Sequence, residues 1–407
     1  MAAKTQQTVL IGFAEALAAP EVVWSLVDAG VRVHAFARSG SAVAIRHSRH
    51  VVCHEVPAPE VDINGSLSGL ESLLAELGRD AGEAAPILFP IDDKSVLLGS
   101  RARLPGRWLL AGPAGTNADL ALNKCLQVQL AREAGFSVPE TALARTAAEV
   151  RSFTARQPFP IILKAAQCVP VSDGRVRSCK KWICASEAEL DTAIAQWEEK
   201  TPLLAQPFFT GVGEGVFGLA APEGVRAWSG HRRLRMMNPQ GSGSSACISL
   251  EVPSDLKAKT REFIERARWR GLFMIELLRD TAGTPWFVEL NGRPWGSMSL
   301  ARRQGLEYPA WHVALAADPA SQAGMKAQVA ADLVCRHMGR EFLHLLFVLR
   351  GPRSKAQGTW PSFWQAARDV FTVRSSDTVY NWRSEDPEVF FADFCATMRD
   401  NLFKSKA

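Results

Sequence analysis

The sequence lacks a long apolar run. Its apolar stretches, such as residues 342–349, fall far short of the roughly 20 residues that a membrane-crossing helix needs. We therefore expect no transmembrane segment. The chain also enters a strand-like run at residues 8–11 without a charged leader or a long apolar core before it, so we expect a cytoplasmic location.

Paired cysteines and long basic blocks are missing as well. The 407 residues include eight cysteines without a Cys-x-x-Cys pair, and the four residues between Cys179 and Cys184 do not give a zinc-ligand spacing. Reduced, buried thiols are the expected state. The formal charge of +5 comes without a Lys/Arg block, so we do not expect nucleic-acid binding. A mildly basic surface instead suits anionic substrates such as nucleotides.

The first 113 residues alternate short apolar runs with helical patterns, which predicts a parallel, Rossmann-like domain. A helix is expected from Pro20 to Gly30, with proline at its start and glycine at its end. The loop at residues 12–16 lacks the repeated glycines of a dinucleotide site, so an NAD-dependent oxidoreductase is a distant alternative. Asp92 and Asp93 end the fourth predicted strand and could face a cleft, although solvated loop acids are the simpler interpretation.

Turn residues at 112–117 mark a domain boundary. Residues 114–205 then combine strand-like runs with two capping-box patterns, at 146–149 and 186–189, which predicts an α+β lobe. A second lobe is expected over residues 206–318. A polar, alanine-rich break at 316–328 precedes a helical C-terminal segment, residues 319–407, in which the apolar helix 336–350 has basic ends.

The stretch 287–297 places chemically active side chains on one short strand. Successive side chains of a strand point to opposite faces, so Glu289 and Asn291 share a face, and Arg293 follows at the same parity. Mg²⁺ takes oxygen ligands, usually one or two carboxylates, and leaves other positions to phosphate and water. A second acid, Glu276, lies inside the apolar strand 272–278, where an unpaired carboxylate is costly and a cation is the expected partner. An edge strand with Glu276 in water is the alternative.

These motifs resemble the ATP-grasp superfamily of ATP-dependent carboxylate-amine ligases. That family carries an acid on one strand and Glu-x-Asn on the next, and this chain differs in having Gly292 where proline is usual and Pro294 after the arginine. The resemblance covers roughly residues 5–315. It implies two ATP-binding lobes behind a Rossmann-like domain, with ATP and Mg²⁺ (or Mn²⁺) as cofactors, and metal ligands at Glu276, Glu289 and Asn291.

The resemblance also implies nucleotide-binding residues. Lys164 ends an otherwise apolar run and matches the lysine that reaches the phosphates, and Lys124 matches an earlier nucleotide-contacting lysine; snorkelling or exposed lysines are the alternatives. Residues 203–211 resemble the hinge that holds adenine, through Gln206, Phe208 and Phe209, although Pro207 removes a backbone donor. Glu214, in a glycine-rich strand, is expected near the ribose.

A row of polar side chains follows along residues 225–235. Alternation places Ser229, His231, Arg233 and Arg235 on one face, which could bind a substrate carboxylate or the transferring phosphoryl group; a solvated strand face is the alternative. The sequence leaves open which of Arg232, Arg233 and Arg235 faces the cleft. Residues 238–245 are rich in glycine and serine and predict a loop that closes over the reactants.

The resulting hypothesis is a ligase that phosphorylates a substrate carboxylate and lets an amine displace the phosphate. Arg233 and Arg293 would stabilise the phosphorylated intermediate, with backbone N–H groups near Gly296 and Ser297 assisting, while His231 and Arg235 would contact substrate. The expected partners are a small-molecule carboxylate and amine, and a homodimer is compatible with the sequence. A phosphotransferase and a non-catalytic nucleotide sensor remain as alternatives.

Overall fold

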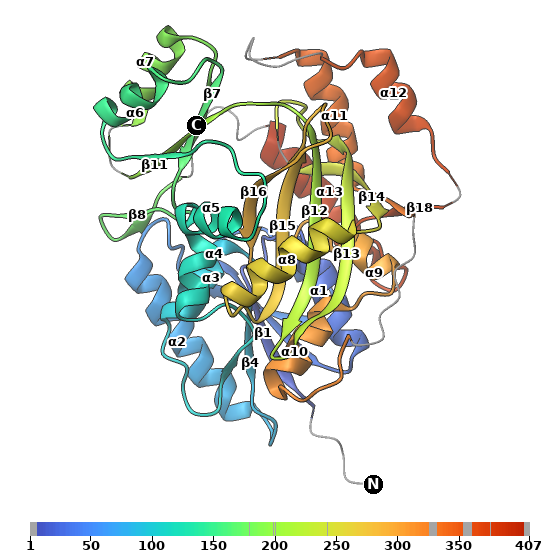
Figure 1. The fold of residues 1–407 in the computed structure, drawn as a ribbon. Coiled ribbons are helices and arrows are strands. Elements are labelled where there is room, and N and C mark those ends of the chain that lie inside the picture. Colours follow the sequence, from blue (N-terminus) through green and yellow to red (C-terminus); the bar gives the residue numbers. More distant parts are fainter. Residues whose placement is uncertain are drawn as a thin grey trace.

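The computed structural model describes residues 6–178, 180–197, 199, 201–241, 243–324, 332–352, 360–374 and 376–402. Three main sheets organise these residues, and helices cover their outer faces (Figure 1). Cys179, Ser242 and part of the predicted break at 316–328 lie outside the described residues. Over the described ranges, no helix is both long enough and apolar enough to cross a membrane.

The N-terminal sheet is parallel, in the order β3-β2-β1-β4-β5, as the alternating sequence pattern predicts. Its elements are β1 (Thr8–Gly12), α1 (Ala19–Asp28), β2 (Arg32–Arg38), the 3-10 turn η1 (Ala44–His47), β3 (Val51–Val56), α2 (Ile63–Asp80), β4 (Ile87–Pro90), α3 (Asp93–Arg101) and β5 (Leu109–Leu110). Val9 and Ile11 enter one apolar cluster and Leu10 enters another. Both faces of β1 are therefore covered, which is why its sequence is continuously apolar.

A smaller sheet follows two helices, α4 (Thr116–Leu122) and α5 (Lys124–Glu133). It has the order β10-β7-β11-β6, with antiparallel neighbours. Its elements are β6 (Ala142–Ala144), α6 (Ala147–Thr154), β7 (Ile161–Ala165), β10 (Lys181–Cys184), α7 (Glu187–Trp197) and β11 (Leu203–Pro207), and a hairpin of β8 (Val171–Ser172) and β9 (Arg175–Val176) lies apart. The Thr146–Glu149 capping box opens α6 as expected.

One face of the small sheet is apolar and carries the two helices. Ile161 and Leu163 of β7 pack with Leu203 and Ala205 of β11 and with side chains of α6 and α7. Because strand side chains alternate, Lys164 points to the opposite face, away from this core. The small sheet therefore presents a polar face that does not pack on its own helices.

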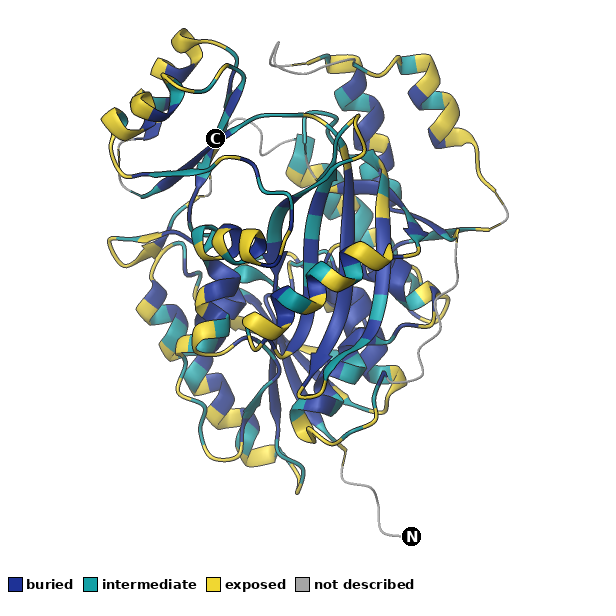
Figure 2. Cartoon of the chain, in the orientation of Figure 1, coloured by how far each residue is buried: buried dark blue, intermediate teal, exposed yellow. Residues whose placement is uncertain are grey.

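The large sheet is antiparallel except at its last pair, in the order β16-β15-β12-β13-β14-β17-β18. Its strands and associated helices are β12 (Val212–Ala221), β13 (Gly224–Met236), β14 (Ser244–Leu250), α8 (Ser254–Arg266), β15 (Gly271–Arg279), β16 (Pro285–Asn291), α9 (Met298–Arg303), α10 (Tyr308–Ala317), β17 (Val334–Arg336) and β18 (Asp377–Val379). One apolar cluster includes residues of β1, α1, β12, α9 and α10, so the large sheet and the N-terminal sheet share a core (Figure 2).

The C-terminal residues form α11 (Met338–Arg350), α12 (Phe363–Phe371) and α13 (Pro387–Leu402), which agrees with a helical segment. The sequence did not predict that β17 and β18 extend the large sheet from this same segment. Each has only three residues, too few for a clear alternation. The domain limits at residues 113, 205 and 318 stay predictions.

Candidate functional site

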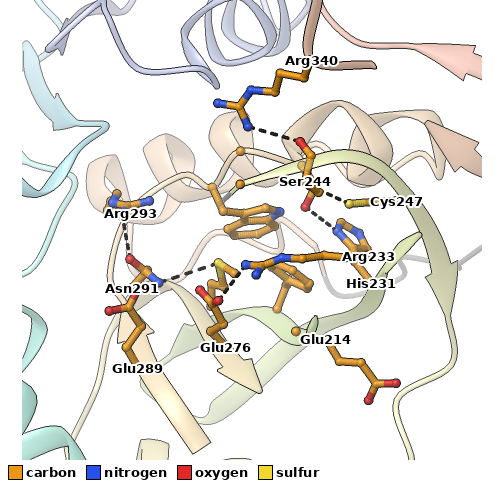
Figure 3. A pocket seen from close by; sticks show the side chains of 17 residues that line it. Glu214, His231, Arg233, Ser244, Cys247, Glu276, Glu289, Asn291, Arg293 and Arg340 are labelled. Atoms are coloured by element: carbon orange, nitrogen blue, oxygen red, sulfur yellow. Dashed lines mark hydrogen bonds and ion pairs between the residues drawn. The ribbon is translucent and has the colours of Figure 1, made fainter. Parts of the chain in front are cut away.

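A cavity lies on one face of the large sheet, where α11 approaches β13 and β14 (Figure 3). We call it the central cavity. It is lined by Glu214, Gly215, Phe217, His231, Arg233, Gly243, Ser244, Cys247, Met274, Glu276, Glu289, Asn291, Arg293, Trp295, Gly296, Ser297 and Arg340. It therefore contains all three predicted metal ligands and both predicted catalytic arginines.

The three predicted metal ligands come from two neighbouring strands. Glu276 of β15 and Glu289 of β16 are direct partners in the antiparallel ladder, and a bulge follows Glu276. Asn291 is on the same face as Glu289, and its Oδ1 accepts a hydrogen bond of 2.7 Å from Arg293 Nη2. The strand parity read from the sequence thus gives the arrangement that the structure has.

Each carboxylate of this group has a cationic partner from another part of the chain. Arg233 Nη2 lies 2.7 Å from Glu276 Oε1, and Lys124 Nζ lies 3.0 Å from Glu289 Oε2. The charge of Glu276 raises the pKa of the Arg233 guanidinium. Burial, the largest single influence, raises the pKa of the Glu289 carboxyl, but the combined effect of Lys124, Lys164 and Arg293 lowers it. The lowered pKa keeps Glu289 in its charged form, and the side chains of both acids lie beside a cation.

Arg293 connects the large sheet to the N-terminal sheet. Its Nε and Nη2 lie 2.9 and 3.0 Å from the two carboxylate oxygens of Asp93, a two-pronged pair that fixes the guanidinium plane. The interpretation of Asp93 as a solvated loop acid is therefore wrong. Asp92 instead caps α3 by accepting a hydrogen bond from the Ser95 backbone N–H at 2.7 Å. The position of Asp93 at the carboxyl edge of a parallel sheet was the signal that favoured a role at the cleft.

Lys164 is directed toward the acids of the large sheet. Burial is the main cause that lowers its pKa, to about 8, followed by repulsion from Lys124, while Glu289 and Glu276 act in the opposite direction. Its ammonium forms no hydrogen bond or ion pair with the residues that the structure describes. The backbone N–H of Lys124 donates to Ala166 O at 2.9 Å, which ties the start of α5 to the end of β7. The two lysines thus approach the acids from the small-sheet side.

The predicted hinge residues lie outside the lining of the central cavity. Gln206 is on the same face of the small sheet as Lys164, and its Nε2 donates to Thr141 Oγ1 at 2.7 Å. Phe209 packs on Trp286 of β16 with ring centroids 5.4 Å apart, and the Phe208 N–H donates to Pro160 O. Their predicted contact with adenine stays a prediction.

Two predicted residues are engaged elsewhere. Glu214 lies between Arg232 and Arg279, at 2.8 Å from each, and its carboxylate points away from the cavity although the residue lines it (Figure 3). Arg235 departs from the expected row because the pairing of β13 with β14 shifts register at Arg233 and again at Arg235. The Arg235 guanidinium contacts Glu341 of α11 at 2.6 Å and does not line the cavity.

The remaining predicted residues do meet at the cavity. His231 Nδ1 lies 2.8 Å from Ser297 Oγ, and the imidazole packs on Phe217 with centroids 4.2 Å apart. Burial lowers the pKa of His231 to about 3, so its ring is neutral at physiological pH. The neutral ring is hydrogen-bonded to Ser297, the residue that directly precedes α9. Gly296 lines the cavity beside it, next to the buried Trp295.

Several lining residues were not predicted, and Arg340 of α11 is the most consequential. In the sequence, Arg340 follows Asn291 by about fifty residues, inside a segment for which only an apolar helix with basic ends was predicted. Cys247, Met274 and Trp295 were missed because single apolar or thiol side chains carry no pattern of their own. Only the packing of α11 on β14 reveals that Arg340 belongs to the site.

The residues fit a hard divalent ion. Two carboxylates and an amide oxygen supply the oxygen ligands that Mg²⁺ prefers, with positions left for phosphate and water. In the part of the chain that the structure describes, no group of three or more His, Cys, Asp or Glu residues could hold a metal by itself. An ion held at Glu276, Glu289 and Asn291 would therefore depend on ligands from its substrate.

No family model and no curated protein matches the sequence. Several solved structures are similar to this one. The L-amino acid ligase from Bacillus licheniformis has a TM-score of 0.60 at 13% identity, covering 82% of this chain and 79% of that one. An ADP complex of purK, an N5-carboxyaminoimidazole ribonucleotide synthetase, has a TM-score of 0.61 at 13% identity, covering 90% and 96%.

A third similar structure is the biotin carboxylase domain of 2-oxoglutarate carboxylase from Hydrogenobacter thermophilus, in complex with MgADP, ADP and bicarbonate. Its TM-score is 0.60 at 14% identity, covering 82% of this chain and 74% of that one. At such low identities the likeness concerns the fold, and it covers most of both chains in each comparison. This chain therefore has the ATP-grasp fold.

Proposed function

We propose that this protein is an ATP-dependent ligase that activates a carboxylate as an acylphosphate and joins it to an amine. The observation that carries the proposal is the pairing of Glu276 with Arg233 and of Glu289 with Lys124 in one cavity. A nucleotide bound with divalent ions would bring positive charge to the acids and negative phosphates to the released cations. Each acid would then exchange its arginine or lysine partner for a metal ion, and each released cation would exchange its carboxylate partner for a phosphate.

The bond to be made explains why phosphate is needed. A carboxylate is a poor electrophile, and amide formation in water is uphill, whereas a phosphorylated carboxylate has a good leaving group. Magnesium, with manganese as an alternative ion, would supply charge neutralisation at the phosphoryl group when held by Glu276, Glu289 and Asn291. The chain itself contributes positioning and fixed charge, and the reaction requires no protein nucleophile.

The residues divide into a nucleotide side and a substrate side. Lys124 and Lys164 approach from the small-sheet side and would contact phosphates, while Gln206, Phe208 and Phe209 would hold the base. Arg293, held flat by Asp93, and Arg233 would stabilise negative charge on the acylphosphate and on the tetrahedral species that follows it. His231 is neutral and buried, so we assign it the positioning of Ser297 and no proton transfer.

The testing experiment measures phosphate release by the full chain with ATP and MgCl₂, adding pooled small carboxylates and pooled amines separately and together. A ligase releases ADP and phosphate in amounts that require both pools. Mass spectrometry of the mixture should then show the amide product. ADP formation that needs only a carboxylate or an alcohol, with a stable phosphorylated product, would replace the ligase by a phosphotransferase.

A binding-only role makes a different prediction in the same experiment. A nucleotide sensor would bind the non-hydrolysable analogue AMP-PNP with Mg²⁺ and release no phosphate with any pool. Isothermal titration with AMP-PNP therefore runs beside the turnover assay. If AMP-PNP does not bind with or without Mg²⁺, the proposed use of ATP is wrong.

A further inference from the structure

Arg340 enters the central cavity from the C-terminal segment. It is the third residue of α11 and lies across the cavity from Glu276 and Glu289 (Figure 3). The chain therefore brings a guanidinium to the site from outside the strands that carry the acids. The proposed use of ATP gives this side chain no role, because the two lysines that would contact phosphates, Lys124 and Lys164, act on the acids from the small-sheet side.

The bonding of Arg340 differs from that of neighbouring arginines. Arg233, Arg235 and Arg336 each have a glutamate within 2.9 Å. Arg340 donates from Nη1 to the backbone oxygen of Ser244 at 3.2 Å and forms no ion pair with any residue that the structure describes. A guanidinium has five N–H donors, so most of its hydrogen-bonding capacity is unused.

The local charges do not replace the missing partner. Asp393 of α13 is the acid whose charge acts on Arg340, but its carboxylate lies 3.1 Å from His337 Nε2. Arg233, from the neighbouring strand, adds a repulsive charge. Burial is the largest effect, and it lowers the pKa of Arg340. Burying a guanidinium whose charge is only weakly balanced by nearby acids is energetically unfavourable unless an anion binds to it.

The loop before β14 is shaped to accept this guanidinium. A Cβ built on Gly243 would lie 2.5 Å from Arg340 Nη1, so a larger residue would push the guanidinium away. Ser244, whose carbonyl accepts the hydrogen bond, follows directly. On the other side of the same loop, Lys181 Nζ of β10 donates to Gly241 O at 3.3 Å. This loop, which is predicted to close over the reactants, is thus in contact with both the small sheet and Arg340.

We infer that Arg340 binds a carboxylate that does not react, on the substrate held across the central cavity from the acids of β15 and β16. This inference rests on the proposed ligase function and specifies its substrate class. The carboxylate that becomes phosphorylated lies beside Arg293 and Arg233, so the anion at Arg340 is a second one. It belongs either to a dicarboxylic acid substrate or to an amine substrate that is itself an amino acid or peptide.

The test begins with the unmodified protein and needs no knowledge of the substrate. Isothermal titration is performed with two matched panels, in the presence and absence of AMP-PNP and MgCl₂. One panel pairs each common L-amino acid with its amide, and the other pairs C3–C5 dicarboxylates with their monoamides. We expect members of one panel to bind roughly tenfold or more tightly with the free carboxylate, since hydrogen bonds to charged groups are stronger than neutral ones.

Variants then assign that preference to Arg340. Arg340→Gln should weaken binding of the preferred carboxylate by roughly 10- to 100-fold, leave its neutral counterpart unchanged, and leave AMP-PNP affinity unchanged. Arg340→Lys should give an intermediate loss, because the charge remains but the planar fork is lost. Gly243→Ala should also weaken binding of the preferred carboxylate, because the added methyl group displaces the Arg340 guanidinium while the arginine itself is kept. The matched control is Arg303→Gln, because Arg303 donates to the Trp382 carbonyl oxygen at 2.9 Å and lies outside the cavity lining.

The outcomes separate this inference from the proposed function. Equal binding of acids and neutral counterparts, absence of binding by both panels at millimolar concentration, or retention of the preference in Arg340→Gln would overturn the role of Arg340. The panel that shows the preference identifies whether the acid or the amine substrate carries the second carboxylate. Failure of AMP-PNP to bind would instead refute the use of ATP, and the carboxylate preference would still be decided by the titrations without nucleotide.

Discussion

Glu276 and Glu289 lie directly opposite each other in the ladder of β15 and β16. Two like charges at such a position destabilise a sheet unless other groups compensate them. Arg233 and Lys124 provide the compensation here, and they come from β13 and from the start of α5. The acid pair is therefore held ready by cations that a bound nucleotide and its metal ions would replace.

The first prediction concerns this acid pair. Glu289→Gln and Glu276→Gln keep the side-chain volume and remove the charge that would hold the metal, so phosphate release should fall on the order of a thousandfold, and the Mg²⁺ concentration for half-maximal activity should rise. Glu262→Gln is the control, because Glu262 is an exposed acid of α8 paired with Arg266. Turnover within about tenfold of the unmodified chain would remove these residues from the metal site.

The second prediction concerns the link between Asp93 and Arg293. A double-mutant cycle with Asp93→Asn and Arg293→Lys should give a coupling of about 1–2 kcal/mol in the free energy of unfolding, because the pair is bidentate but partly exposed. Urea denaturation measures it. Asp93→Asn should also reduce kcat, since Arg293 loses the partner that orients it. Additive single effects would mean that the two residues do not act together.

The third prediction is a pH dependence that originates at Lys164. Burial and Lys124 lower its pKa to about 8, and the protonated ammonium is the form that attracts phosphate. Affinity for AMP-PNP with Mg²⁺ should therefore be constant below about pH 7, and should decrease toward a tenfold loss per pH unit above about pH 8. In Lys164→Arg the guanidinium stays protonated, so the decrease should disappear.

Isothermal titration between about pH 6.5 and 9.5 measures this dependence directly, because an unshifted lysine would titrate only near pH 10. A decrease that persists unchanged in Lys164→Arg would assign the titration to another group. A flat profile in the unmodified chain would mean that Lys164 does not contact the phosphates.

The fourth prediction compares two glycines near the start of β12. A Cβ on Gly213 would lie 2.6 Å from Arg233 Cδ, in a side chain that can move, whereas a Cβ on Gly211 would collide with the backbone oxygen of Arg279. Gly213→Ala should displace Arg233 from Glu276 and lower activity about tenfold with little change in melting temperature. Gly211→Ala should lower the free energy of unfolding by about 1–3 kcal/mol.

Activity and thermal melting of the two variants, measured side by side, make the comparison. Each glycine variant is the control for the other, since both add one methyl group to neighbouring positions of the same segment. Normal activity in Gly213→Ala would show that the Arg233–Glu276 pair is not needed for turnover.

Much of the site could be predicted from strand parity. Glu289 and Asn291 share a face because side chains alternate along a strand, and an isolated acid in an apolar strand, such as Glu276, requires a cation. The same reasoning failed at Arg235, because it assumes an unbroken strand. The bulges of β13 change the direction of the side chain, and no residue type in the sequence marks them.

The sequence by itself determined the parallel N-terminal sheet, the acid-bearing strand pair and the basic residues around it. These features follow from hydrophobic periodicity, from the alternation of side chains along a strand and from the energetic cost of burying a charge, and all three act among a few neighbouring residues. Only the tertiary structure decided which cation meets which acid. Lys124 and Asp93 contact the lining residues Glu289 and Arg293, and Arg340 lines the cavity itself. The three residues come from segments far apart in the chain, and their positions depend on how sheets and helices pack. Packing is a property of whole surfaces, so these partnerships could not be predicted from any local pattern.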